Sequence, residues 1–175
     1  MNIALVGPMG VGKTTIGRLL ADRLRLGFVD TDREIEQRSG ADIPWIFDVE
    51  GEEGFRARES VVLQDLLDSD GQVIATGGGI VLKEANRTAL HRGATVIYLK
   101  AGVERLLERT SRDKRRPLLQ VDDPESKIRE LIEFRHPLYE AVSHQIFSAE
   151  GNRPRQLVGK IARYCESELA DASKG

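Results

Sequence analysis

The sequence predicts an α/β fold in which helices cover both faces of a parallel β-sheet. Short apolar runs rich in β-branched residues alternate along the chain with segments whose apolar residues recur at helical spacing. The first apolar run leads directly into a glycine-rich loop and then into a helical segment. Strands and helices that alternate in this way form right-handed crossovers between parallel strands.

The predicted strands are short and apolar along most of their length. They are Ile3–Val6, Phe28–Asp30, Val73–Thr76 and Thr95–Leu99, with Gln145–Phe147 as a weaker candidate. A continuous apolar run is typical of a parallel strand, because helices cover it on both faces. We therefore expect these strands to form a sheet that is buried on both sides.

The predicted helices are marked by apolar stripes between the strands. Residues three and four apart lie on one face of a helix, so a repeated apolar spacing of this kind indicates a helix that packs on a core. The stripes are Ile16, Leu19, Leu20 and Leu24; Val62, Leu63, Leu66 and Leu67; Val103, Leu106 and Leu107; and Leu157, Val158, Ile161 and Leu169.

The composition is that of an ordinary globular protein, and it argues against several classes. The 175 residues are 40% hydrophobic and 31% charged, and we expect them to form a single domain over residues 1–175. A net charge of -2 gives no broad attraction to nucleic acid or to an anionic membrane. The N-terminus runs straight into a strand, and no apolar stretch approaches the roughly 20 residues that span a bilayer. We expect a cytoplasmic monomer whose one cysteine, Cys165, forms no internal disulfide.

The most specific motif is the loop after the first predicted strand, Gly7-Pro8-Met9-Gly10-Val11-Gly12-Lys13-Thr14. It satisfies G-x-x-x-x-G-K-[ST] between a strand and an amphipathic helix, which is the setting of a P-loop. Its glycines allow backbone N–H groups to form an anion-binding nest at the helix N-terminus. We expect Lys13 to reach the β- and γ-phosphates of a nucleotide and the Thr14 hydroxyl to bind Mg²⁺. The predicted nucleotide-binding residues of this loop are Gly10, Val11, Gly12, Lys13, Thr14 and Thr15.

Other motifs separate the classes of P-loop protein. A GTPase needs an N-K-x-D segment to read guanine, and the sequence has none. Asp48–Gly51 matches D-x-x-G, but it follows a helix-like stretch instead of a strand, so we interpret this match as chance. The sequence also lacks an acidic run at the end of an apolar strand. These absences argue against a GTPase and against a conventional Walker B motif.

Further segments follow the P-loop in the order FVDTD, IFDVEGEEGFRARE, ATGGG, RRPLL and FRHPLY. Together with the P-loop they resemble the shikimate kinase family, and the resemblance extends from Ile3 to about Leu169. It implies the fold of the nucleoside-monophosphate kinases, with a five-stranded parallel sheet in the order 2-3-1-4-5, a substrate-binding region at about residues 32–60 and a mobile lid at about residues 111–123. The implied reaction transfers the γ-phosphoryl group of ATP to the 3-hydroxyl of shikimate, on the pathway to chorismate and the aromatic amino acids.

Two aspartates, Asp30 and Asp32, lie at the end of the second predicted strand, at the sheet edge where open α/β folds bind ligands. The resemblance implies that Asp30 supports Mg²⁺ and that Asp32 holds the acceptor hydroxyl as general base. In a loose phosphoryl-transfer transition state, positioning by Asp32 can matter more than proton removal. Either residue can instead cap the helix that contains Ile35, because Asp is a good N-cap, but we expect at most one to serve only as a cap.

Shikimate carries a carboxylate, so its site needs cationic or backbone donors. By resemblance, Arg56 and Arg135 bind the substrate, and a guanidinium can hold a carboxylate through two parallel hydrogen bonds. Glu59 lies three residues after Arg56 on a predicted helix, a spacing that suits it to orient the guanidinium.

Three consecutive glycines, Gly77–Gly79, follow the third predicted strand. Glycine loses more backbone entropy on folding than any other residue, so a run of three needs a reason. A tight turn needs one or two of them. We expect the bare backbone to leave room for the two reactants, and the resemblance implies that Gly78 and Gly79 contact shikimate.

The segment SRDKRRPLLQVDD, Ser111–Asp123, is polar, highly charged and interrupted by a proline. By itself it predicts a solvated loop, whereas by resemblance it is the lid that closes over ATP and excludes water. The resemblance then implies that Arg116 neutralises phosphate charge and that Arg109 lies against adenine. Arg153 matches the adenine-binding region of the family loosely.

Several conspicuous side chains are interpreted as structural. His91, His136 and His144 do not have the spacing of a metal site, and none stands at a catalytic position of a motif. Trp45 and Phe47 are expected to pack between the helices on the substrate side.

Three functions are compatible with these motifs. The first is a shikimate kinase with Lys13, Asp32 and Arg116 as catalytic residues, Mg²⁺ as cofactor, and ATP and shikimate as small-molecule partners. The second is another P-loop kinase, for gluconate or a nucleoside monophosphate, and the paired arginines, the DTD and the glycine run argue against it. The third is a non-catalytic nucleotide-binding regulator, and the intact catalytic residues argue against that.

Overall fold

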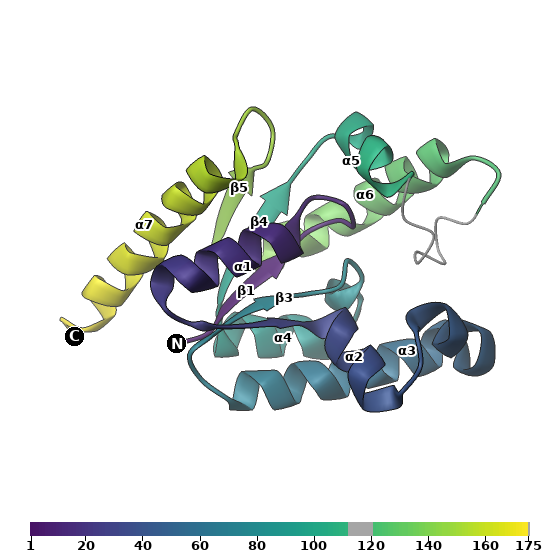
Figure 1. Ribbon diagram of the computed structural model, residues 1–175, viewed down its shortest axis with the longest axis horizontal. Coiled ribbons are helices and arrows are strands. Elements are labelled where there is room, and N and C mark those ends of the chain that lie inside the picture. Colours follow the sequence, from purple (N-terminus) through teal and green to yellow (C-terminus); the bar gives the residue numbers. More distant parts are fainter. Residues whose placement is uncertain (112–120, 175) are drawn as a thin grey trace.

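The computed structural model describes residues 1–111 and 121–174 and has a five-stranded sheet at its centre (Figure 1). The order across the sheet is β2-β3-β1-β4-β5, and every neighbouring pair is parallel. The predicted strand order is therefore confirmed. The strands are β1 (Ile3–Val6), β2 (Gly27–Asp30), β3 (Gln72–Ala75), β4 (Thr95–Lys100) and β5 (Gln145–Ser148).

The predicted strands agree with the observed ones to within one residue at each end. Thr76, predicted as the end of the third strand, lies just beyond β3. The expectation of burial on both faces is correct for most of β1, β3 and β4 and wrong for β2 and β5. β2 and β5 are the edge strands, and part of each is exposed because each has a neighbour on one side alone.

Helices connect the strands, and the predicted apolar stripes correspond to α1, α3, α5 and α7. The apolar stripes do not include α4 or α6, which were not predicted as separate helices. In the ranges 1–111 and 121–174, no helix is both long and apolar enough to cross a membrane. The helices are α1 (Lys13–Leu24), α2 (Thr31–Ser39), α3 (Ile43–Asp68), the short 3₁₀ helix η1 (Ile80–Leu82), α4 (Glu84–Gly93), α5 (Val103–Thr110), α6 (Pro124–Val142) and α7 (Pro154–Ala172).

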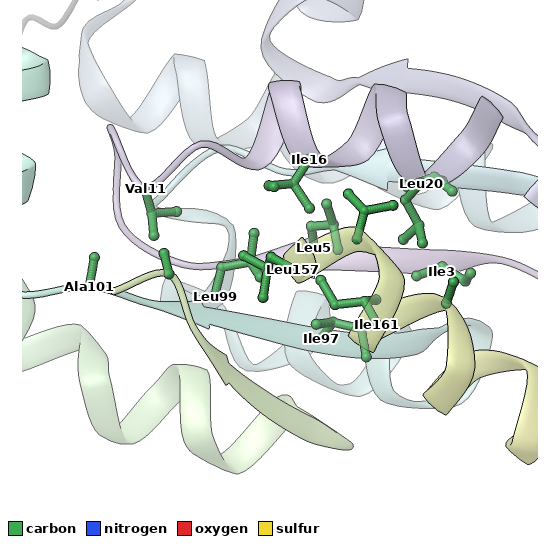
Figure 2. Packing of buried hydrophobic residues seen from close by; sticks show 14 of the residues in the cluster. Ile3, Leu5, Val11, Ile16, Leu20, Ile97, Leu99, Ala101, Leu157 and Ile161 are labelled. Carbon is green, nitrogen blue, oxygen red and sulfur yellow. The ribbon is translucent and has the colours of Figure 1, made fainter. Parts of the chain in front are cut away.

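The helices form two layers, one on each face of the sheet (Figure 1). On one face, α1 and α7 pack against β1 and β4 through an apolar cluster that includes Leu5, Ile16, Ile97 and Ile161 (Figure 2). On the other face, α3, α4 and α6 pack on the alternate strand positions, such as Val6. Burial of one Leu or Ile side chain contributes roughly 1.5–3 kcal/mol. The two layers therefore hold the ends of the central strands in place.

α3 consists of two helical segments joined by a kink at Gly51, where φ is 73° and ψ is 179°. This φ is accessible to glycine and strained for residues with a side chain. The kink is the glycine of the D-x-x-G match, so Asp48–Gly51 lies within a helix and does not follow a strand. The interpretation of this match as chance agrees with the structure.

Candidate active site

The predicted site residues gather at the carboxyl ends of three adjacent strands. The P-loop follows β1, Asp30 is the last residue of β2, and Gly77–Gly79 follow β3 after Thr76. Because β2, β3 and β1 are neighbours in the sheet, these segments lie side by side although they are distant in the sequence. This is the edge at which open α/β sheets bind ligands.

The P-loop has the backbone geometry of an anion-binding nest. Gly10 and Gly12 have φ angles of 81° and 105°, and Gly12 is the N-cap of α1. Left-handed glycines beside a helix N-terminus turn backbone N–H groups toward a common point. The buried Lys13 ammonium donates hydrogen bonds of 2.7 and 2.8 Å to the carbonyl oxygens of Gly7 and Pro8. Lys13 is thereby held against the loop.

A cavity of about 440 Å³ opens at the P-loop. Thr76 and Glu108 line this cavity and were not predicted as site residues. The position of Thr76 between a strand and the glycine run was the feature of the sequence that could have identified it. The Val11 side chain is buried in the core, so its backbone is what can face a ligand. Arg153 is exposed at the start of α7 and does not line the cavity, so its role stays a prediction. The cavity is lined by Gly10, Gly12, Lys13, Thr14, Thr15, Asp30, Asp32, Thr76, Glu108 and Arg109.

Asp30 joins the P-loop to α2. Its Oδ2 accepts a hydrogen bond of 2.6 Å from the Thr14 hydroxyl, and its Oδ1 accepts from the backbone N–H groups of Asp32 and Arg33 at 3.0 and 3.2 Å. Asp30 is therefore the N-cap of α2 as well as a partner of the P-loop. The Thr14 oxygen retains lone pairs while it donates its proton, and hydroxyl and carboxylate oxygens are hard ligands that suit Mg²⁺. This donor set fits the predicted metal.

Arg56 and Glu59 form a buried ion pair on α3. Arg56 Nη1 lies 3.0 Å from Glu59 Oε1, and Glu59 is fully buried. A longer contact of 3.4 Å joins Arg56 to the more exposed Glu52. Burial raises the pKa of the Glu59 carboxyl to about 7 against the opposing effect of Arg56, and the nearby Asp32 charge also raises it. The spacing of three residues thus lets Glu59 hold the guanidinium in one orientation.

Arg135, on α6, lies near the Arg56–Glu59 pair. It is 4% exposed and lies beside Gly78, since a Cβ on that glycine would sit 3.5 Å from Arg135 Nη1. The buried Nε atoms of Arg56 and Arg135 have no hydrogen-bond partner among the described residues. Leaving a buried donor unsatisfied costs about 1–3 kcal/mol. Both guanidinium groups are therefore suited to receive an acceptor such as a carboxylate.

Gly77 and Gly79 are required by close approach and not by unusual backbone angles, and a Cβ on Gly78 would lie 3.3 Å from the backbone N of Met9 in the P-loop. A Cβ on Gly79 would lie 2.4 Å from the Arg56 guanidinium. A Cβ on Gly77 would lie 2.7 Å from Asp32 Oδ1 and 2.9 Å from Glu59 Oε2. At Gly77 and Gly79 the charged side chains of Asp32, Arg56 and Glu59 occupy the space that a Cβ would need, and contact of Gly78 and Gly79 with shikimate stays a prediction. The glycines thus allow Asp32, Arg56 and Glu59 to come together.

Thr31, the middle residue of DTD, is a site residue that the sequence interpretation missed. It is fully buried, and its Oγ1 accepts a hydrogen bond of 3.0 Å from the Gly77 N–H. The bond ties the start of α2 to the first glycine. A hydroxyl side chain between two aspartates at the end of a strand was the signal that could have identified it.

Known proteins of similar sequence identify the family. A family model described as shikimate kinase matches residues 9–166. The chain belongs to the shikimate kinase family. A shikimate kinase of Pseudomonas putida is 55% identical to it over 157 residues, which cover 90% of this chain and 91% of the relative.

Solved structures agree with this membership of the shikimate kinase family. The shikimate kinase from Acinetobacter baumannii in complex with shikimate has a TM-score of 0.93 at 50% identity, over 95% of this chain and 93% of that one. A gluconokinase from Sinorhizobium meliloti has a TM-score of 0.60 at 17% identity, over 97% of this chain and 96% of that one, and this likeness shows a shared fold alone. The predictions of the fold and of an ATP-dependent kinase of the shikimate kinase family are confirmed.

Of the two arginines that the family resemblance places at the phosphates and at adenine, the structure describes Arg109 and not Arg116. Arg116 and the predicted lid, apart from Ser111 and residues 121–123, lie outside the described residues, so the role of Arg116 stays a prediction. Arg109, at the end of α5, lines the cavity, and its Nη1 would be 3.3 Å from a Cβ on Gly12. Arg109 therefore borders the P-loop, as a residue beside a nucleotide should.

The interpretation of Trp45 as a packing residue is wrong, because 53% of this residue is exposed. It lies on the first segment of α3, where the neighbouring Ile46 faces the core and Trp45 faces solvent. Phe47 does pack, with its ring centroid 4.9 Å from that of Phe55. Cys165 is also structural, since burial raises the pKa of its thiol to about 11 and a protonated thiol is unreactive.

Proposed function

We propose that this chain transfers the γ-phosphoryl group of ATP to the 3-hydroxyl of shikimate, giving ADP and shikimate 3-phosphate. The observation that carries the proposal is the position of Asp32. Its carboxylate lines the cavity at the P-loop and also lies against Gly77, close to the Arg56–Glu59 pair. A residue that borders both the phosphate loop and a buried guanidinium group is suited to hold the hydroxyl of an anionic acceptor.

In this proposal, Asp32 accepts a hydrogen bond from the 3-hydroxyl and takes its proton as the oxygen attacks phosphorus. The transition state of phosphoryl transfer is loose, so orientation of the hydroxyl is a large part of this role. Lys13 donates to the phosphate oxygens as negative charge moves toward the leaving ADP. Arg116 is assigned a similar role from the lid.

We assign the shikimate carboxylate to Arg56 and Arg135. Both guanidinium groups are buried, and both have an Nε–H without a partner among the described residues. Charge-assisted hydrogen bonds from a guanidinium to a carboxylate are about twice as strong as neutral ones. Glu59 fixes the orientation of Arg56, and the backbone of Gly78 and Gly79 adds further polar groups beside the two guanidinium groups.

We propose Mg²⁺ as the cofactor, held through Thr14 and Asp30 and otherwise by phosphate oxygens and water. The described residues contain no cluster of three metal-binding His, Cys, Asp or Glu side chains, which suits an ion that takes one or two protein ligands. When bound, Mg²⁺ neutralises phosphate charge during the transfer.

The remaining assignments follow from membership of the family. Arg109 and Arg153 are assigned to the adenine end of ATP, and the segment at about residues 111–123 to the lid. We propose that residues 1–175 form one kinase domain that acts as a cytoplasmic monomer on ATP and shikimate. A net charge of -2 supports the further proposal that it binds neither nucleic acid nor an anionic membrane.

An ATP-consumption assay with alternative acceptors tests this function. The purified protein is mixed with ATP, Mg²⁺ and, in turn, shikimate, quinate, gluconate and nucleoside monophosphates, and the product is identified by ³¹P NMR. We expect turnover with shikimate and a product phosphorylated at the 3-hydroxyl. Turnover with gluconate or a nucleoside monophosphate in place of shikimate would overturn the proposal. Nucleotide binding without turnover of any acceptor would indicate a regulator.

A further inference from the structure

Tyr139 lies on α6, one turn after Arg135, and is 1% exposed. Residues four apart share a helix face, so the two side chains approach the same segment. The Tyr139 hydroxyl donates a hydrogen bond of 2.6 Å to the carbonyl oxygen of Gly78. Arg135 Nη1 would lie 3.5 Å from a Cβ on the same glycine. Two successive turns of α6 thus contact the middle glycine of the run.

The hydrogen bond to Gly78 orients a whole peptide unit. The C=O of Gly78 and the N–H of Gly79 belong to one planar trans peptide, in which these two groups point in opposite directions. A donor that holds the carbonyl therefore also decides where the Gly79 N–H points. The direction of that N–H matters because Gly79 lies directly against the Arg56 guanidinium, 2.4 Å from where its Cβ would be.

The glycine run makes such an anchor necessary. A peptide between two glycines rotates with little steric hindrance, because neither residue has a Cβ. The hydrogen bond from the Gly77 N–H to Thr31 acts two peptide units earlier. The turn bond of 3.1 Å from the Ile80 N–H to the Gly77 carbonyl spans the peptide between Gly78 and Gly79 without contacting the C=O or N–H of that peptide. The hydroxyl of Tyr139 is the group that holds this peptide at its carbonyl.

Tyr139 is itself well held. Its ring packs against that of Tyr98, with centroids 5.0 Å apart, and Tyr98 in turn pairs with His136 through its hydroxyl at 2.8 Å. Burial raises the pKa of the Tyr139 phenol to about 12, so the hydroxyl keeps its proton at neutral pH. A fixed ring and a permanent proton are what an orienting donor requires.

We propose that Tyr139 is a positioning residue for the acceptor: its hydroxyl turns the Gly78–Gly79 peptide so that the Gly79 N–H faces the acceptor site. This inference rests on the proposed function, in which these two glycines contact shikimate. Loss of the hydroxyl should weaken binding of the acceptor much more than binding of the nucleotide. Neither Tyr139 nor the glycine run lines the cavity beside Lys13 and Thr14, and Gly78 meets the P-loop only at the backbone of Gly7 and Met9.

Tyr139→Phe tests the proposal, because it removes the hydroxyl and keeps the ring. Without this donor the peptide can rotate to satisfy its carbonyl elsewhere, and the cost of turning it back on binding should raise the KM for shikimate by about 5- to 100-fold and change the KM for ATP much less. Tyr98→Phe is the matched control, since Tyr98 is equally buried and its hydroxyl pairs with His136 instead of the glycine run. We expect wild-type KM values for both substrates in the control.

Three results would overturn the proposal: an unchanged KM for shikimate in Tyr139→Phe, equal losses for shikimate and ATP, or the same loss in Tyr98→Phe. If Tyr139→Phe does not fold, para-methylphenylalanine and para-aminophenylalanine at position 139 replace it. The two have the shape of tyrosine, and the amino compound alone keeps a donor. We expect a raised KM for shikimate with the methyl compound and a value near wild type with the amino compound, and equal values would overturn the proposal.

Arg135→Ala distinguishes failure of this inference from failure of the site assignment. A raised KM for shikimate in Arg135→Ala together with an unchanged one in Tyr139→Phe would overturn the role of Tyr139 alone. An unchanged KM for shikimate in both variants would mean that α6 does not border the acceptor, and would overturn the acceptor assignment as well.

Discussion

The proposed nucleotide half of the site and the proposed acceptor half are built in different ways. The nucleotide half is built around one continuous stretch, residues 7–15, in which Gly10 and Gly12 take left-handed φ angles, with Asp30 and Arg109 beside it. The acceptor half comprises Asp32, Arg56, Glu59, Gly77–Gly79 and Arg135, which come from α2, α3, α6 and the segment after β3. The first half is shaped by local backbone geometry. The second is an assembly of charged side chains that the fold brings together.

Glycine serves different purposes in the two halves. Gly12 has a φ of 105°, which residues with a side chain rarely adopt. Gly79 has an ordinary φ of -94°, and the reason for glycine there is the Arg56 guanidinium, which a Cβ would approach to 2.4 Å. The comparison teaches that a run of glycines after a strand can mark the close approach of charged side chains as well as a turn.

The largest effect is expected at Asp32, which borders both halves. Asp32→Asn keeps the shape of the side chain and removes its ability to take a proton, so turnover should fall by about 10²–10⁴-fold. Steady-state kinetics should show little change in the KM for ATP, because Lys13 and the P-loop are unaltered. Asp30→Asn is the control in the nucleotide half, where we expect a raised Mg²⁺ requirement that added metal partly rescues. Near-normal turnover in Asp32→Asn would remove the general-base role.

The next prediction distinguishes the two halves by which ligand binds more weakly in each variant. Truncating one partner of a buried, hydrogen-bonded charge pair costs about 2–5 kcal/mol. In Arg135→Ala this loss should fall on shikimate binding and spare ATP binding, as measured by titration calorimetry with each ligand. Lys13→Ala is the reciprocal control, with its loss on the nucleotide side. Equal losses for both ligands in Arg135→Ala would show that the division into halves is drawn in the wrong place.

The pH dependence of stability tests the charge balance of the acceptor half. The pKa of Glu59 in the folded protein is about 7, above its ordinary value of 4.5, so the folded state binds this proton more tightly. Its contribution to stability is therefore fully present below pH 4.5 and is lost as the pH rises through about 7. Each pKa unit corresponds to 1.36 kcal/mol, so wild type should lose about 2–3 kcal/mol of unfolding free energy relative to Glu59→Gln over this range.

Denaturant unfolding of both proteins at a series of pH values measures this difference. The comparison between them cancels the contribution of His144, whose pKa is lowered by burial and whose effect on stability therefore has the opposite sign. A difference that does not change with pH would mean that folding leaves the pKa of Glu59 at its ordinary value.

The smallest effect is spectroscopic. Trp45 is the one tryptophan of the chain, and it stands half exposed on the first segment of α3. Shikimate without nucleotide should change its fluorescence emission, and Arg56→Ala should abolish the change. If the emission does not change, the environment of the first segment of α3 is not altered by shikimate. That result would not contradict the kinase activity.

The nucleotide half and the central strands could be predicted because their signals are local. A P-loop needs its glycines, lysine and threonine at fixed spacing, and a buried strand needs a run of apolar residues, so both are visible in a short window. The α6 helix was not predicted although Ile128, Leu131 and Ile132 recur at helical spacing, because polar residues separate these positions and Pro137 interrupts the pattern. Trp45 was misjudged because an aromatic side chain does not by itself reveal which helix face it occupies.

The sequence by itself determined the P-loop, the parallel strands, the family and the identity of the charged residues at the acceptor half. Tertiary structure alone decided how those residues meet: that the glycines make room for Arg56 and Asp32, that Thr31 holds Gly77, and that Tyr139 holds Gly78. The physical reason is the range of the interactions. Backbone angles and apolar periodicity act within one element, whereas hydrogen bonds and close contacts join residues whose separation in the chain carries no information about their separation in space.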